Sequence, residues 1–372
     1  MRTEIASLEA LRAHREAGRD LRNVVLVGLD LTGPSEDDLL RTAMDGAVLW
    51  GCELTSRARR QAEAAGSLLF PVIPSLPYQV YRTSLYTPAE LFAGFSADRP
   101  ESYADTPDAR IYQHSKAEGR QPDPLHALAE RLHDHSITAA LTETLAKCAT
   151  GPVAVMGGHA LTRDSAGYRG AMRLGASLGR AGLTVLTGGG PGAMEAVPYG
   201  VRFPDDFDSV LKELARAPHF GAGATEIGRW LAAGLAVDVP SPAGPPRTIG
   251  IPTWFYGHEP PNPACTVHAK YFANSVREDG LLTVATGGVV YTPGSAGTVQ
   301  EVFQDYTQNH YGSVGPAAPM VFLGKDFWTN DVPAAPLVQQ LARGREAEQW
   351  ITVTDDVDEA VAVLKAYSAT RP

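Results

Sequence analysis

The sequence predicts an α/β fold, a Rossmann-like doubly wound parallel sheet that is flanked by helices and preceded by a smaller α/β domain. Short apolar runs alternate with segments of helical periodicity along most of the 372 residues, which is the element order of parallel α/β sheets. One strand–helix–strand unit spans roughly 35 residues, as expected for a βαβ connection. Two apolar runs also lead into glycine-rich turns that open helices, and such turns lie at the carboxyl edge of a sheet.

The first 121 residues predict a small α/β domain without a catalytic constellation. A charged amphipathic segment at 4–18 predicts a helix, and Ser35 is expected to cap a second helix that begins near Pro34. The aromatic and proline-punctuated segments within 76–92 predict an ordered loop and a short helix. A buried strand is expected at 23–28 and further short strands at 47–50 and 67–70, with a helix at 56–65.

Residues 122–150 predict a linking helix, because their leucines recur at helical spacing. His126, His133 and His135 lie within it. They do not show the i, i+4 pair on one face, with its glutamate, that helical zinc sites use. We therefore expect no metal at these histidines.

The larger domain, residues 151–372, has the most regular alternation of strands and helices. It does not contain the dinucleotide fingerprint G-x-G-x-x-G with a downstream acid in its usual form, so NAD is not favoured. The expected strands are 153–158, 183–187, 247–254, 288–291, 320–323 and 350–353, and the expected helices are 164–181, one or two within 204–236, 266–278, one that begins near 302, 337–343 and 357–367.

The central feature is the segment 291–301, Tyr-Thr-Pro-Gly-Ser-Ala-Gly-Thr-Val-Gln-Glu, which follows an apolar run. A strand that enters a glycine-rich turn and then a helix presents unpaired N–H groups and a positive dipole end, which together form an anion site. Gly294 and Gly297 permit close approach of a ligand. Glu301 lies one turn into the helix, where a carboxylate repels phosphate and so indicates chemistry at the other end of a ligand. The simpler alternative is an ordinary strand–turn–helix connection with Thr298 as its cap.

A second turn of the same kind strengthens the functional interpretation. The run 183–187 leads into Gly-Gly-Gly-Pro-Gly at 188–192 and then into Ala-Met-Glu, which ends at Glu195. Pro191 suits a first helical turn, where a missing N–H costs nothing. The glycines again permit the backbone to contact a phosphate.

The two turns together resemble the signature of the LOG (Lonely Guy) family of nucleoside 5′-monophosphate phosphoribohydrolases, long mislabelled as lysine decarboxylases. The segment 293–301 follows the family motif PGGxGTxxE, except that Ser295 replaces the second glycine. Residues 187–196 follow the motif TGGGPGxMEA of the larger bacterial members. The resemblance covers residues 150–370.

This resemblance implies hydrolysis of the N-glycosidic bond of a nucleoside 5′-monophosphate to free base and ribose 5-phosphate, without a metal or an organic cofactor. It implies that Glu301 stabilises the developing ribosyl cation or orients water, and that Glu195 contacts the ribose or supports the site from behind. The implied substrate-binding residues are Gly157, Gly158, Gly188, Gly189, Gly190, Gly192, Met194, Glu195, Glu259, Asn262, Pro293, Gly294, Ser295, Gly297 and Thr298, of which Glu259 and Asn262 belong to a segment matching the family's E-x-x-N-P.

One family feature is altered in this sequence. LOG enzymes carry an Arg-Lys pair in the helix before the PGGxGT strand, and that Arg is held to be catalytic, whereas this chain has Ala269 and Lys270. Arg277 lies nearly two helical turns after Lys270, so both are expected on one face of a helix at 266–278, near the substrate. We expect Lys270 and Arg277 together to replace the family's catalytic Arg-Lys pair. The simpler alternative is that Arg277 is an ordinary surface arginine near a helix end.

Two other functions fit parts of this pattern. The altered Arg-Lys pair favours a non-catalytic nucleotide sensor that uses the same pocket, whereas the retained Glu301 favours an enzyme. Amino-acid decarboxylation would need pyridoxal phosphate on a Schiff-base lysine, and Lys270 is the only lysine near the motifs.

Composition narrows the classes of partner. A net charge of −10 without a basic stripe argues against nucleic acid. Three widely spaced cysteines form neither a disulfide framework nor a zinc pattern, and no apolar run reaches the ~18 residues of a membrane span. A reducing cytoplasm fits these features, whereas the AMP-like nucleotide ligand and a homodimer or higher homo-oligomer are what the resemblance implies.

Overall fold

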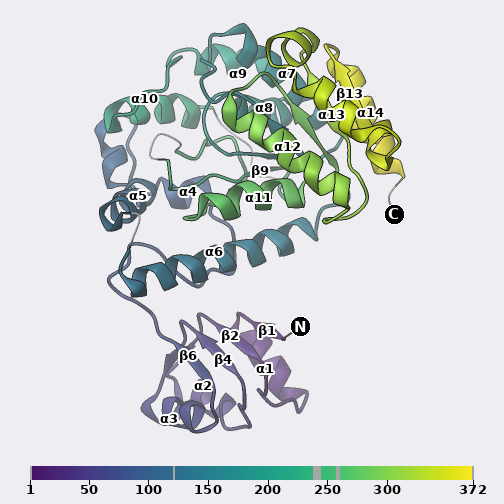
Figure 1. Ribbon diagram of the computed structural model, residues 1–372. Helices are drawn as coiled ribbons and strands as arrows, with labels where there is room; N and C mark the ends of the chain where they lie inside the picture. The colour runs from purple at the N-terminus through teal and green to yellow at the C-terminus, as the bar shows by residue number, and fades with distance from the viewer. Residues whose placement is uncertain (1, 120–121, 238–243, 257–259, 371–372) are drawn as a thin grey trace. The chain divides into compact units, whose positions relative to one another are not determined.

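The computed structural model describes residues 2–119, 122–237, 244–256 and 260–370, which form two compact units (Figure 1). The first unit consists of residues 1–84 and 120–140, and the second of 85–119 and 141–372. Residues 85–119 thus pack with the second unit, whereas their sequence position suggested the amino-terminal domain. Among the described residues, none of the helices combines the length and the apolar character that a membrane crossing requires.

The first unit is a small α/β domain with a four-stranded parallel sheet. Buried aliphatic residues such as Leu11, Leu26 and Leu49 form its core. The strands β1 (Glu4–Ile5), β2 (Val25–Val27), β4 (Val48–Trp50) and β6 (Leu68–Phe70) lie in this spatial order, and β3 (Asp30–Leu31) pairs separately with β5 (Glu53–Leu54). The helices are α1 (Leu8–Glu16), α2 (Pro34–Leu39) and α3 (Ser56–Ala64).

Two details of the first unit differ from expectation. The predicted helix at 4–18 starts only after β1, because Ser7 caps α1 by accepting a hydrogen bond of 3.1 Å from the Ala10 N–H. The N-cap of α2 is Gly33 and not Ser35. Pro34 already occupies the first helical position, which its fixed φ and missing N–H suit.

The second unit contains the predicted Rossmann-like sheet, with seven strands that all pair in parallel. The strands are β7 (Val153–Met156), β8 (Val185–Thr187), β9 (Thr248–Gly250), β10 (Val267–His268), β11 (Gly288–Tyr291), β12 (Met320–Leu323) and β13 (Ile351–Thr354). From β7 the chain moves outward through β8 and β9 to β10, and then returns to the other side of β7 as β11, β12 and β13. The strand order reverses between β7 and β11, which is where doubly wound sheets bind ligands.

Helices cover both faces of this sheet. They include α7 (Ala166–Arg180), α8 (Ala193–Arg202), α11 (Asn274–Val284), α12 (Ala296–Tyr311), α13 (Ala334–Ala342) and α14 (Val357–Ala369). Val153, Val185 and Val290 lie in one buried cluster with residues of α7, α8 and α14. Tyr291 points to the opposite face, where its hydroxyl donates a 2.6 Å hydrogen bond to Asp305 of α12. Figure 1 shows α11 and α12 side by side on the molecule.

The segment 85–119 packs on a helix of the second unit. Phe92 and Tyr103 join Ile227 and Trp230 in a buried cluster. The elements involved are α4 (Pro88–Leu91), a 3₁₀ helix (Pro100–Asp105), α5 (Pro107–Glu118) and α10 (Ala224–Leu235). The remaining elements are α6 (Pro124–Leu145), which is the helix predicted at 122–150, α9 (Phe207–Leu214), a π-helical segment (Phe327–Asp331) and a 3₁₀ helix (Glu346–Trp350).

The helices α7 and α8 approach each other backbone to backbone. A Cβ on Gly175 would overlap the Val197 carbonyl, and a Cβ on Gly200 would overlap the Met172 carbonyl. These glycines are needed for close contact and not for a turn. Because α8 begins directly after the glycine turn at 188–192, this contact also positions that turn.

Candidate functional site

The carboxyl ends of β7, β8 and β11 lead into three glycine turns that contact one another. The Gly158 N–H donates to the Pro293 carbonyl at 3.2 Å, and the Ala193 N–H donates to the Gly158 carbonyl at 3.1 Å. The N–H and the hydroxyl of Thr292 both donate to the Met156 carbonyl, at 2.9 and 3.1 Å. The turns therefore form one backbone cluster at the reversal of strand order, the edge at which the sequence predicts a site.

Two glycines of this cluster are required by packing alone. A Cβ on Gly157 would overlap the Thr292 hydroxyl. Gly192 has a φ of +72°, and a Cβ there would stand 2.5 Å from the Gly158 carbonyl oxygen and 2.6 Å from that of His159. A side chain at either position would push the turns apart, whether or not a ligand is bound.

The helix α12 begins at this cluster with an uncapped amino end. Ser295 occupies the N-cap position, but its side chain makes no capping hydrogen bond. Ser295 and Gly297 are exposed, so a solute can reach the first turn. The predicted cap, Thr298, is buried with its side chain against Gly294. An accessible, uncapped start of a 16-residue helix attracts anions.

Glu301 lies in the second turn of α12 and is half-buried. Of the two acidic side chains in the glycine motifs, Glu195 is fully buried and Glu301 is not. Glu301 is therefore the motif carboxylate that remains partly accessible beside the anion-attracting helix start.

The turn after β8 is buried throughout residues 188–192. The Thr187 hydroxyl maintains its shape by accepting from the Gly189 N–H at 3.2 Å and donating to the Met194 carbonyl at 3.0 Å. Gly189 has a φ of +75°, which glycine adopts without strain. The turn at 188–192 is thus a buried support of the glycine cluster, whereas the start of α12 is exposed to solvent.

Asn262 donates a hydrogen bond to a carbonyl of α8 that a proline in this helix cannot supply. Pro198 lies inside α8 and has no N–H to donate to the Met194 carbonyl, four residues earlier. The Asn262 amide donates to that carbonyl and to the Gly190 carbonyl, both at 3.1 Å. Its oxygen accepts from two backbone N–H groups of the following residues. Asn262, which the resemblance implies as a substrate contact, is here a fully buried brace of the glycine turn.

Glu195 belongs to a buried ion pair that the sequence does not reveal. Its carboxylate accepts from the Arg163 guanidinium at 2.5 and 3.1 Å and from the Tyr168 hydroxyl at 2.9 Å. Burial alone would lower the pKa of Arg163, but the adjacent Glu195 carboxylate outweighs it and raises that pKa. Burial, and then the charge of Glu195, raise the pKa of Tyr168 well above its usual value. These contacts support a positioning role for Glu195 behind the turn.

The predicted helix at 266–278 is wrong. Residues 267–268 form β10, and α11 begins only at Asn274. Lys270 therefore lies outside the helix, and the spacing of seven residues does not bring it onto one face with Arg277. Backbone pairing overrides local helical periodicity here, because His268 bonds both to β9 and to Tyr86.

Arg277 nevertheless reaches the glycine cluster. It is buried, and its Nε donates to the Ile251 carbonyl at 2.8 Å. Its Nη2 lies beside Gly188, together with the thioether of Met194. The interpretation as an ordinary surface arginine is excluded by this burial.

Lys270 is held in a second buried cluster. Its Nζ donates to Asp108 Oδ1 at 2.6 Å, and the same carboxylate accepts from Trp254 Nε1 at 3.0 Å and from Tyr103 at 3.1 Å. The ammonium also lies 5.1 Å from the centre of the Trp254 ring. Its charge is neutralised inside the unit, which does not suit a Schiff-base lysine or a catalytic partner of Arg277.

The remaining predicted residue, Glu259, lies outside the described residues. Among the residues that the sequence did not single out, Arg163 and Asp108 are the most consequential. Neither stands in a motif, and each is separated from its partner by a long stretch of chain, 32 and 162 residues respectively.

No model of a known protein family matches the sequence, and no curated protein matches it. Among solved structures, the molybdenum cofactor binding protein from the phototrophic bacterium Rippkaea orientalis is 16% identical, with 59% of this chain and 98% of that chain covered and a TM-score of 0.37. The molybdenum cofactor carrier protein from Chlamydomonas reinhardtii is 20% identical, with 59% and 99% covered and a TM-score of 0.36. These likenesses are partial, and the fold and the site described above stand on the chain's own strand order and contacts.

Proposed function

We propose that the protein binds the phosphate of a nucleoside 5′-monophosphate at the start of α12 and hydrolyses the N-glycosidic bond of this nucleotide. The observation that carries the proposal is the accessible, uncapped start of α12 at the reversal of strand order, with Glu301 one turn later. A helix start of this kind favours phosphate. A carboxylate so close to it would weaken a site that only held phosphate, because like charges repel.

The proposed reaction uses Glu301 at the sugar end of the nucleotide. The C1′–N bond breaks and its electron pair leaves with the base, while the oxygen of a water molecule bonds to C1′. Glu301 stabilises the ribosyl cation that develops between these events, and it orients the water or accepts its proton. The base takes up a proton as it departs. Binding of the remote phosphate positions the sugar for this step.

Arg277 supplies the fixed positive charge in this proposal. It is buried behind the Gly188 turn and held by the Ile251 carbonyl. A cation there favours the phosphate or the electron-rich departing base. Lys270 takes no part in the proposed reaction, because Asp108 neutralises its charge.

A non-catalytic nucleotide sensor is the alternative. The observation that favours it is the burial of both Glu195 and the turn at 188–192, which leaves few accessible groups for chemistry. The resemblance also implies a homo-oligomer, which is compatible with both functions. Light scattering of the purified protein measures its oligomeric state.

The deciding experiment is incubation with AMP, GMP, CMP and UMP, with free base measured by chromatography and binding by calorimetry. Release of base together with ribose 5-phosphate supports the hydrolase. Saturable binding without release supports the sensor, and the absence of binding by all four nucleotides rejects both.

A further inference from the structure

A cavity of about 660 Å³ lies at the edge of the seven-stranded sheet opposite the glycine turns. Gly151 and Pro152, which directly precede β7, line it, as does Gly287, which directly precedes β11. These are the amino ends of strands whose carboxyl ends carry the candidate site. The volume is within the range of roughly 300–1,000 Å³ that small-molecule sites occupy.

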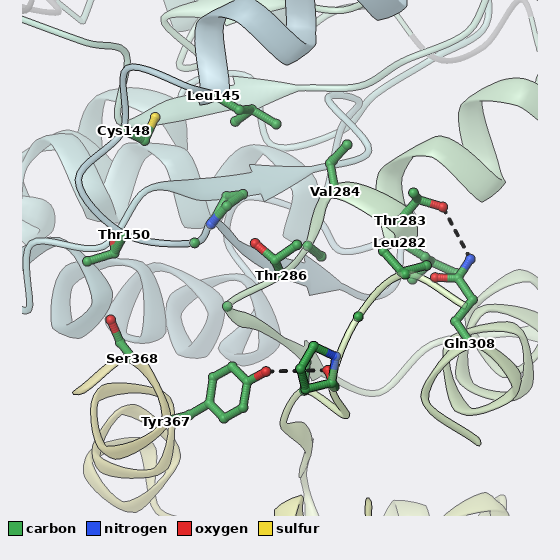
Figure 2. A pocket seen from close by; sticks show the side chains of 18 of the residues that line it. Leu145, Cys148, Thr150, Leu282, Thr283, Val284, Thr286, Gln308, Tyr367 and Ser368 are labelled. Atoms are coloured by element: carbon green, nitrogen blue, oxygen red, sulfur yellow. Dashed lines mark hydrogen bonds between the residues drawn. The ribbon is translucent and has the colours of Figure 1, made fainter. Parts of the chain in front are cut away.

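Figure 2 shows how side chains from separate elements surround this cavity. Leu145 and Cys148 come from the end of α6 and the loop after it, and Thr286 from the loop before β11. In the view of Figure 2, Thr286 lies between these residues and Tyr367 of α14. The walls are therefore contributed by the segments that precede β7 and β11 together with the end of α6, α11, α12 and α14.

The lining offers neutral hydrogen-bonding groups and no positive charge. Of the described residues that line the cavity, none is lysine, arginine or histidine. Some polar groups already bond within the wall: Gln308 donates to the Thr283 hydroxyl at 3.3 Å, and Tyr367 donates to the Pro316 carbonyl at 3.5 Å. Apolar side chains such as Leu145 and Leu282 form the rest of the surface.

The only acidic side chain among the described lining residues is Asp305, and it is almost fully buried. Its carboxyl accepts from Tyr291 at 2.6 Å and from the Asn309 amide at 3.3 Å. Burial raises the pKa of Asp305 to about 7. An anionic ligand would meet no counter-charge here and would stand near a carboxyl group that can ionise, so phosphate-bearing molecules are disfavoured.

We propose that this cavity is a second binding site, for an uncharged small molecule that carries hydrogen-bonding groups on an apolar body. It differs in ligand chemistry from the anion-attracting crevice at the other edge of the sheet. Both edges belong to the same two strands, since the cavity lies at the amino ends of β7 and β11 and the crevice at their carboxyl ends.

Cys148 provides a reporter in the wall of the cavity. It is partly exposed, whereas Cys52 and Cys265 are buried. Burial raises the pKa of Cys52 to about 11 and that of Cys265 to about 12, so these thiols react slowly. Iodoacetamide, which is small and uncharged, should therefore alkylate Cys148 first, and peptide mass spectrometry of the full-length protein measures the rate.

The test compares two pairs of probes that differ mainly in charge: adenosine with AMP, and benzamide with benzoate. We expect adenosine or benzamide to slow alkylation of Cys148 severalfold in a saturable manner, and the anionic partner to have little effect. The substitution Thr286→Phe fills the cavity and should abolish the protection. Thr307→Phe is the matched control, because Thr307 is exposed on α12 and lies outside the lining.

Equal protection by the neutral and anionic probes would overturn the proposed ligand class. Absence of protection by both neutral probes, up to their solubility limits, would overturn the site. If Thr286→Phe fails to fold, the alkylation rates of Cys148 in the unsubstituted protein, with and without each probe, still test the proposed site. The comparison of benzamide with benzoate does not depend on nucleotide hydrolysis, because neither probe carries an N-glycosidic bond, so failure of this site and failure of the proposed function are distinguishable.

Discussion

The Nη2 atom of Arg277 lies 2.6 Å from the point at which a Cβ on Gly188 would stand. A buried cation and the first glycine of a phosphate-type turn thus occupy adjoining space. A Cβ at position 188, whose φ is not in the left-handed region, would crowd this guanidinium and, still more closely, the sulfur of Met194. The same relationship joins α11 to the turn after β8, although Arg277 and Gly188 are far apart in sequence.

Substitution of Gly188 by alanine should therefore displace the side-chain ends of Met194 and Arg277. We expect a loss of about 1–3 kcal/mol in the free energy of unfolding, as for overpacked sites, and weaker binding of AMP. Gly170→Ala is the control, since Gly170 has open space around it in α7. The free energy of unfolding of this variant should equal or exceed that of the parent. Urea denaturation and calorimetry measure both quantities. AMP affinity equal to that of the parent, in a folded Gly188→Ala protein, would remove Arg277 from the site.

Glu301→Gln should retain nucleotide binding and lower turnover by roughly a hundredfold or more, because a charge partner of the transition state is lost. The amide keeps the shape of the side chain and removes only its charge. Glu63→Gln, on the exposed face of α3 in the first unit, should have the parent rate. Steady-state assays of base release decide the question. Hydrolysis by Glu301→Gln at the parent rate would reassign Glu301 to a binding or structural role.

Glu195→Gln should be strongly destabilising. The change leaves the Arg163 charge buried without its carboxylate, and such losses amount to about 3–5 kcal/mol. The comparison is Asp205→Asn, which removes an ion pair with Arg180 whose side chains are 87% and 52% exposed, and should hardly alter stability. Urea midpoints of the two variants measure the difference. If Glu195→Gln were as stable as Asp205→Asn, the buried pair would not be what holds α7, α8 and the turn together.

Asp305 should make stability depend on pH. Its pKa is raised to about 7 in the folded protein by burial and is near 3.8 when the chain is unfolded. Its contribution is therefore fully present below pH 4 and is lost as pH rises through 7, with a slope of about 1.4 kcal/mol per pH unit between these values. Relative to Asp305→Asn, the parent should lose stability from pH 5 to pH 8.

Urea denaturation of the parent and of Asp305→Asn at four pH values checks this prediction. Asp98→Asn, at an exposed position, serves as the control and should follow the parent. A constant difference between the parent and Asp305→Asn across the pH range would show that Asp305 titrates at its ordinary value.

The architecture of the second unit could be predicted because its central strands carry strong local signals. Residues such as Val153, Val155 and Val290 are buried in a sheet that is covered on both faces, so the apolar runs are continuous. The glycine turns mark where these strands end. Their meeting at the reversal of strand order follows from the βαβ pattern alone.

The sequence-based predictions were wrong where distant segments of the chain determine the local structure. A two-residue strand such as β10 has no periodicity to detect, and it forms because β9 and Tyr86 supply backbone partners. Lys270 stands after this strand, and its partner Asp108 comes from a segment that the sequence joined to the first domain. Only the three-dimensional packing of 85–119 brings the two charges together.

The features of the candidate site also fall into those that local sequence determines and those that distant contacts determine. The glycine turn that leads into α12 and the position of Glu301 on that helix follow from local sequence, whereas the absence of a capping side chain does not. The brace that Asn262 provides for the Met194 carbonyl does not, because it compensates for Pro198 across a gap in the chain. The motif resemblance therefore gathered residues that lie at one edge of the sheet, but it did not distinguish accessible residues from residues that maintain the turn.

The interlocked glycines of α7 and α8 limit how this protein can move. With Gly175 and Gly200 seated on opposing carbonyls, neither sliding nor rotation of one helix against the other is possible without backbone collision. The two helices and the turn at 188–192 behave as a rigid plate. Under the proposed function, closure around a nucleotide would therefore not involve movement of α7 against α8, and Glu195 on α8 would keep its position relative to α7.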